Sequence, residues 1–100
     1  MSAGERGARP EGWVVGVMLA AAGEPMQRWY YAVGRADRSQ AEWTAIDWAA
    51  RLGEVAASPM DGLEPVEALR PLTRPAMARL GLAPGQVREL GWRYPRRWLS

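Results

Sequence analysis

The chain contains neither cysteine nor histidine among its 100 residues. Without cysteine it has no disulfide framework and no thiolate metal site. Without histidine it lacks the commonest general base, the usual zinc ligand and every nucleophile system in which histidine activates serine or cysteine. Any chemistry would therefore have to use carboxylates, hydroxyl groups and arginine.

Lysine, asparagine and phenylalanine are also absent, so all 13 basic residues are arginine. The missing amino acids mostly have AT-rich codons, which favours a GC-rich bacterial genome as the cause over selection for a function. Hydrophobic residues make up 48% of the chain and charged residues 24%. That balance is typical of a globular protein, and the length is that of one domain.

The formal net charge of +2 conceals an uneven distribution of charge. Residues 1–68 hold six arginines against ten acidic residues, whereas residues 69–100 hold seven arginines against Glu89 alone. The net charges of the two parts are therefore −4 and +6. This asymmetry indicates a polyanion or an acidic partner on one face, or packing of the two parts against each other.

An apolar run at residues 13–22 could be a signal peptide or a membrane-spanning segment. It resembles a signal peptide because it ends in small residues, but two glutamates precede it and it is rich in valine. Ten residues are too few to span a bilayer. We therefore expect a cytoplasmic protein that does not enter a membrane.

The first part of the chain predicts an α/β domain built on a β-hairpin. Residues 1–12 are rich in glycine and charge and are expected to form a flexible arm, with a single domain at 13–100. The segment at about 13–20 is apolar on both of its alternating faces, as in a central strand that is buried on both sides. The segment at about 27–34 has high β propensity and is expected to pair with it.

A helix is expected at residues 39–53, packed against this sheet. Ser39 and Glu42 have the spacing of a capping box, and Gly53 stands where a helix-terminating glycine belongs. Small alanines recur along one face at helical spacing, which would let the helix lie close to the sheet. This pattern is the clearest in the chain.

The remainder predicts a short strand and short C-terminal helices. The strand falls within 54–60, and the sequence at 61–64 is a second capping box ahead of a helix that Pro71 would stop. A further helix is expected between Thr73 and Gly81. Residues 84–94 fit either a helix or a strand. If they are helical, the spacing of Leu80, Gly81 and Val87 is that of a helix-turn-helix.

Two carboxylates are candidates for a site. Each has a structural interpretation, because Glu42 and Asp61 both stand at the expected start of a helix, where a carboxylate satisfies free N–H groups. They also have a catalytic interpretation, since Mg²⁺ binds clustered carboxylate oxygens. Asp61 follows the expected short strand, and a strand end beside a helix start could bring the two together.

The order of these elements resembles the middle of a ribonuclease H domain. The resemblance covers residues 13–70 and rests on two segments, DRSQAEWTAIDWAARLG at 37–53 and VAASPMDGLEPVEAL at 55–69. It implies that Glu42 is the helix carboxylate, that Asp61 is the strand-end aspartate and that Mg²⁺ is the cofactor. The aspartate of the family's first strand has no counterpart here, so the resemblance implies a relative without catalysis of its own.

The basic C-terminal segment is the candidate nucleic-acid-binding surface. Arginine contacts phosphates and exposed aromatic rings stack on bases, and the two alternate here. Equally, the tryptophans could belong to the core with arginine stems covering them. The candidate contact residues are Arg88, Trp92, Arg93, Tyr94, Arg96, Arg97 and Trp98.

The sequence therefore predicts a nucleic-acid-binding or accessory module, without catalysis of its own. If it is an enzyme, it is a divalent-metal-dependent nuclease. The alternative is a structural or protein-interaction domain whose basic segment docks on an acidic protein surface. A homodimer formed through a sheet edge is also predicted, with Trp29, Tyr31 and Trp43 in the interface because aromatic residues are favoured there.

Overall fold

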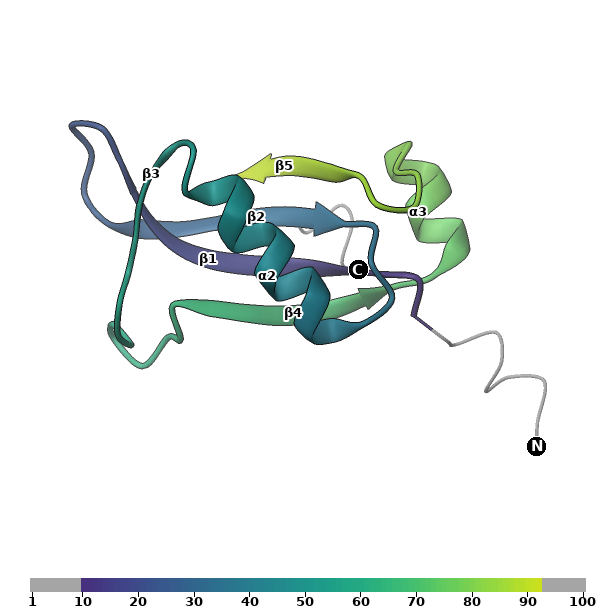
Figure 1. Ribbon diagram of the computed structural model, residues 1–100, viewed down its shortest axis with the longest axis horizontal. Helices are drawn as coiled ribbons and strands as arrows, with labels where there is room; N and C mark the ends of the chain where they lie inside the picture. Colours follow the sequence, from purple (N-terminus) through teal and green to yellow (C-terminus); the bar gives the residue numbers. More distant parts are fainter. Residues whose placement is uncertain (1–9, 93–100) are drawn as a thin grey trace.

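The structure is a computed structural model that describes residues 10–92. Within these residues it is an α/β fold, as predicted, with five strands in one antiparallel sheet and two helices (Figure 1). The elements are β1 (Gly12–Ala21), β2 (Gln27–Val33), α2 (Arg38–Ala49), β3 (Gly53–Val55), β4 (Val66–Leu72), α3 (Arg74–Leu80) and β5 (Val87–Gly91).

Strand β1 is the centre of the sheet. It pairs with β2 along one side, from Trp13 opposite Val33 to Leu19 opposite Gln27, and β5 continues the sheet beyond β2. On its other side β1 pairs with β4 and, near its end, with β3. The residues from Val14 to Leu19 are all buried, which confirms the predicted hairpin and the burial of β1 on both faces.

Helix α2 lies across one face of the sheet (Figure 1). It presents Ala41, Ala45 and Ala49 to the sheet, each with no exposed surface. Because an alanine side chain is only a methyl group, the helix backbone can approach the strands closely. The predicted close packing through alanines is confirmed. This half of the core also contains Val15, Val17, Leu19, Tyr31 and Val33.

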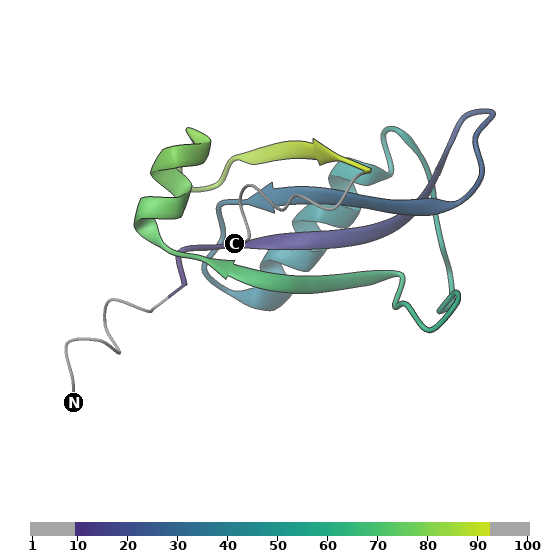
Figure 2. The same cartoon turned by 180° about the vertical axis from the view of Figure 1, so that it is seen from behind.

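Helix α3 lies at one end of the sheet and, with the loop after it, contacts strand residues that point away from α2 (Figure 2). Figure 2 shows this helix beyond the end of the sheet where β4 finishes and β5 begins. Met77 and Leu80 of α3 pack with Leu82 of the following loop against the strands. The strand residues in this second core are Val14, Ala32 and Leu72.

The ends of α2 differ from the prediction. The N-cap is Asp37, whose Oδ1 accepts a hydrogen bond from the Gln40 amide at 2.9 Å, so the capping box at Ser39 is wrong. The helix ends at Ala49 with Ala50 as its C-cap. Gly53 begins β3, where a Cβ would lie 2.1 Å from the Ala20 carbonyl oxygen. This glycine therefore serves close strand contact and not helix termination.

The helix predicted after Asp61 is wrong, because this segment is strand β4. Pairing with β1 supplies its backbone hydrogen bonds, including one donated by Met18 to the Pro65 carbonyl oxygen at 2.8 Å. Pro71 does not stop an element here but lies within the strand. An edge strand tolerates proline because the missing N–H can face away from its neighbour.

The final elements confirm one prediction and correct another. Thr73 caps α3, Pro75 lies in its first turn and Gly81 ends it in the left-handed conformation, all as predicted. Residues 87–91, which the sequence left open, form strand β5. A second short C-terminal helix and the helix-turn-helix are therefore wrong.

The expected arm falls mostly outside the described residues. Its last residues belong to the fold, because the Glu11 amide donates to the Leu72 carbonyl oxygen and Gly12 begins β1. Within residues 10–92, no helix is long and apolar enough to cross a bilayer.

Candidate functional site

Glu42 joins helix α2 to the edge of the sheet. Its Oε2 accepts a hydrogen bond of 2.9 Å from the backbone N–H of Ala68 in β4. Arg38, one helical turn earlier, approaches the same oxygen at 3.9 Å. The N–H of an edge strand is a site at which another strand could add, so the Glu42 carboxylate both attaches α2 to β4 and blocks that edge.

We expect Glu42→Ala to lower the free energy of unfolding by about 1–2 kcal/mol, because it leaves a half-buried N–H without a partner. Glu42→Gln keeps an oxygen that can accept the bond and should lose less. Urea denaturation of both variants measures the difference. An equal loss in the two would contradict this role for the carboxylate.

Asp61 lies in a different setting from Glu42. It is exposed in the tight turn that joins Met60 to Leu63, with a φ of 51°. The contacts of Glu42 are with Ala68 and Arg38, and Asp61 takes part in neither. Among residues 10–92, no three carboxylates gather in a group that could hold a metal ion.

The predicted nucleic-acid contacts are only partly within the described residues. Arg88, on β5, is exposed, and one of its guanidinium nitrogens donates to the Leu80 carbonyl oxygen. Trp92 follows β5 and is 51% exposed. The remaining candidates, Arg93, Tyr94, Arg96, Arg97 and Trp98, lie outside the described residues.

The three aromatic residues predicted for a dimer interface differ in burial. Tyr31 is fully buried in the core beneath α2, so its placement in an interface is wrong. Trp29 is half-buried and packs against the same core. Trp43 is 67% exposed on α2, as an interface residue would be.

A polar groove with a volume of about 690 Å³ lies between α2 and the segment that leads into β5. One wall comes from α2 and the turn after it, and the other from the loop before β5. Arg35, between β2 and α2, is also part of its lining. The lining residues are Arg35, Thr44, Asp47, Trp48, Arg51, Gly81, Leu82, Gly85, Gln86, Val87 and Arg88.

The loop wall of this groove is fixed by backbone contacts with the end of β2. Gly34 donates to the Gln86 carbonyl oxygen at 2.8 Å and accepts from the Gly85 amide at 2.6 Å. A Cβ at Gly34 would lie 2.5 Å from the Ala83 carbonyl oxygen, so only glycine permits this approach. The Gln86 side chain also accepts from the Ala83 amide at 2.8 Å. The groove therefore has a preformed wall.

Within the described residues, no arginine of the groove has an acidic partner. Of the eight arginines in the described part of the chain, three are ion-paired with glutamate and five are not. Three of the five unpaired ones line the groove, and Asp47 is the acidic residue among its lining. The paired arginines are Arg28, Arg38 and Arg74; the unpaired ones are Arg35, Arg51, Arg70, Arg79 and Arg88.

A stacked pair of planar groups forms part of the groove. The Arg51 guanidinium lies over the ring of Trp48, 4.7 Å from its centroid. A hydrogen bond fixes the orientation of the Trp48 ring, because its Nε1–H donates to Glu89 Oε2 at 3.2 Å.

Glu89 stands opposite Tyr31 in the sheet. Burial, and secondarily the charge of Glu89, raises the pKa of the Tyr31 hydroxyl to about 12.

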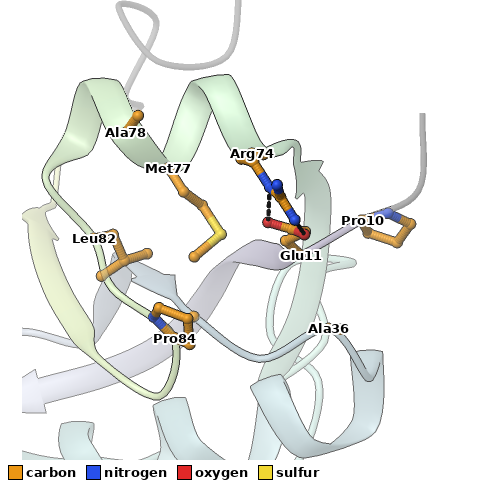
Figure 3. Close-up of a pocket in the computed structure, with 9 residues that line it drawn as sticks. Pro10, Glu11, Ala36, Arg74, Met77, Ala78, Leu82 and Pro84 are labelled. Carbon is orange, nitrogen blue, oxygen red and sulfur yellow. Dashed lines mark hydrogen bonds and ion pairs between the residues drawn. The ribbon is translucent and has the colours of Figure 1, made fainter. Parts of the chain in front are cut away.

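A second cavity, of about 600 Å³, lies at the end of the sheet beside α3. Figure 3 shows Met77, Leu82 and Pro84 along one side and the pair of Arg74 and Glu11 at the other. The Arg74 guanidinium donates to both carboxylate oxygens, at 3.1 and 3.3 Å. This bond and the charge of Glu11 raise the pKa of Arg74. The arginine is already paired, so the cavity offers apolar contact but little free charge.

No family model, curated protein or solved structure matches this chain. The geometry of the two cavities is therefore the basis for inferring a function. The groove, with its unpaired cations, carries the stronger chemical signal.

The sequence did not single out most of the residues that line the groove. Thr44, Asp47, Trp48 and Arg51 follow the spacing i, i+3, i+4 and i+7, which places them on one side of α2 and its following turn. That spacing is visible in the sequence, but the apolar face formed by the alanines is the stronger pattern in the same helix. The opposite wall could not be found in the same way because it depends on where β5 pairs.

Proposed function

We propose that this domain binds nucleic acid through the groove between α2 and β5. The single observation that carries the proposal is the convergence of Arg35, Arg51 and Arg88 from three separate segments onto one groove, none of them ion-paired to a carboxylate in the described residues. Guanidinium groups bind phosphate through two parallel hydrogen bonds. The stacked Trp48 and Arg51 add a planar surface on which a base can lie.

The proposed role is binding without catalysis. Carboxylates in a groove would be needed to hold the metal ions of a nuclease, and among residues 10–92 Asp47 is the one carboxylate in the groove lining. The resemblance to ribonuclease H stays a hypothesis, and the helix expected after Asp61 is strand β4. We further propose a cytoplasmic location, with which the lack of cysteine is compatible.

Replacing Arg35 and Arg51 together with alanine is expected to weaken binding roughly tenfold or more, because two cationic charges and the stacked guanidinium of Arg51 are lost. We would measure fluorescence anisotropy of labelled single-stranded RNA, duplex DNA and an RNA–DNA hybrid with the full chain. Each titration is run at two salt concentrations, with and without Mg²⁺. For a single strand, each lost contact should reduce the slope of log K against log salt by about 0.7.

Arg70→Ala is the matched control for these variants. Arg70 is exposed and unpaired on β4, across the sheet from β5, so it carries the same charge outside the groove. If its loss weakens binding as much as the loss of Arg35 and Arg51, general attraction and not the groove is responsible. Binding to none of the three nucleic acids at low salt would overturn the proposal. Cleavage in the presence of Mg²⁺ would contradict a role without catalysis.

The contacts predicted for the basic C-terminal segment are tested in the same titration. Arg96→Ala combined with Arg97→Ala removes two of them. If this variant alone weakens binding, the nucleic-acid site lies in that segment and the groove proposal is wrong. If both sets of variants weaken binding, the two surfaces form one interface.

A protein-interaction role is the second candidate, favoured by Trp43. A tryptophan with 67% of its surface exposed on a helix is unusual unless it meets a partner. The partner would be an acidic protein surface or a second copy of this chain. Measurement of the molar mass in solution for the chain and for Trp43→Ala tests the dimer, which predicts a twofold change.

A further inference from the structure

Asp47 occupies an unexpected position in the groove. It lines the groove together with three arginines, yet none of the arginines in the described part of the chain brings a guanidinium nitrogen within 4.0 Å of its carboxylate. Arg51 stands four residues later, a spacing at which aspartate and arginine often pair along a helix. Here Arg51 lies over the Trp48 ring instead. The exposed carboxylate of Asp47 is therefore left without a partner within the described residues.

A carboxylate in this place opposes the binding of phosphate. Its negative charge lowers the attraction of the groove for a polyanion, so it does not serve contact with the backbone. Since an ionised carboxylate can only accept hydrogen bonds, it requires a ligand group that donates. In a nucleic acid the bases supply such donors.

Among the bases, guanine fits a carboxylate best. Its Watson–Crick edge carries two adjacent donors, N1–H and N2–H, which can reach both oxygens of one carboxylate. Uracil offers a single N–H between two carbonyl oxygens, and these would face the negative charge. Cytosine and adenine each offer only an amino group at this edge.

The geometry of the groove supports the same choice. Asp47 stands one helical turn before Arg51 and lines the same groove, so a base stacked on the Trp48–Arg51 pair would lie beside the carboxylate. The Watson–Crick edge is accessible only in an unpaired base. A groove of about 690 Å³ also has room for individual nucleotides but not for a duplex.

We propose that the groove binds single-stranded nucleic acid at a guanine, whose N1–H and N2–H donate to the Asp47 carboxylate while Arg35 and Arg88 contact the phosphates. This inference rests on the proposed function and adds its substrate class. Asp47 is the residue that determines base specificity.

The test compares three short single-stranded oligonucleotides by fluorescence anisotropy with the full chain. One is all uridine, one carries a single central guanosine, and one carries inosine there, which lacks the N2 amino group. We expect the guanosine oligonucleotide to bind roughly tenfold more tightly than the uridine one, with inosine losing most of that gain. Asp47→Asn should abolish the preference and leave uridine binding unchanged or tighter, because a negative charge is removed.

Glu54→Gln is the control, since it removes an exposed acidic charge from β3, outside the groove. It should keep the preference for guanosine. Equal binding of the three oligonucleotides by the unsubstituted chain would overturn the inference while leaving the proposed function intact. An equal weakening of all three by Asp47→Asn would also overturn it, because it would indicate a structural role. Binding to none of them would instead overturn the proposed function.

Discussion

Leu80→Ala is expected to lower the free energy of unfolding by about 2–5 kcal/mol. Leu80 is 1% exposed in the last turn of α3, where it packs in the core formed with Leu72 and Leu82. Alanine and leucine have similar helix propensities, so the loss would come from packing and not from the helix itself. Urea denaturation with an unchanged m value measures it.

The control for this substitution is Leu52→Ala. Leu52 is 39% exposed in the turn after α2, so removing its side chain should change stability by less than about 0.5 kcal/mol. Similar losses at the two positions would contradict the docking of α3 on the sheet. Because Gly81 and Leu82 line the groove directly after Leu80, the variant also reports how far nucleic-acid binding depends on this core.

The parts of the fold that the sequence predicts are those fixed by neighbouring residues. The hairpin follows from two apolar segments separated by a short loop, and α3 follows from Thr73, Pro75 and Gly81, which act on their own turns. Strand β4 does not follow in this way. Leu63, Val66 and Leu69 have a helical spacing, but pairing with β1 decides the structure, and β1 lies about 50 residues earlier in the chain.

The candidate site likewise depends on contacts between residues that are far apart in the sequence. The sequence identifies Glu42 but not its partner, because the N–H that it accepts from belongs to Ala68, 26 residues away. Arg35 and Arg51 are unremarkable as isolated arginines. They become a candidate site only because β5 pairs with β2 and brings the loop before it opposite α2. The distribution of charge along the chain indicates the C-terminal segment, whereas the lack of ion pairs among the described residues indicates the groove.

Raising the pH from about 10 to 12 is expected to destabilise the fold by about 2 kcal/mol through Tyr31 alone. Burial raises the pKa of its hydroxyl to about 12, from an ordinary value of 10.0. Below pH 10 the hydroxyl keeps its proton in both states, so stability is unaffected. Between the two values the unfolded chain releases the proton and the folded chain does not. The stability therefore falls as the pH rises through this window.

Tyr31→Phe isolates this contribution, because phenylalanine has the same ring and no proton to lose. The difference in unfolding free energy between the two proteins, measured by urea denaturation at several pH values, should grow from pH 10 to pH 12. At neutral pH the variant should be at least as stable as the unsubstituted chain. The Tyr31 hydroxyl is buried without a hydrogen-bond partner in the described part of the chain, and removing such a group removes a desolvation cost of about 1 kcal/mol or more. Parallel losses of stability in the two proteins would show that another group titrates, and a marked loss at neutral pH would show that the hydroxyl is bonded in solution.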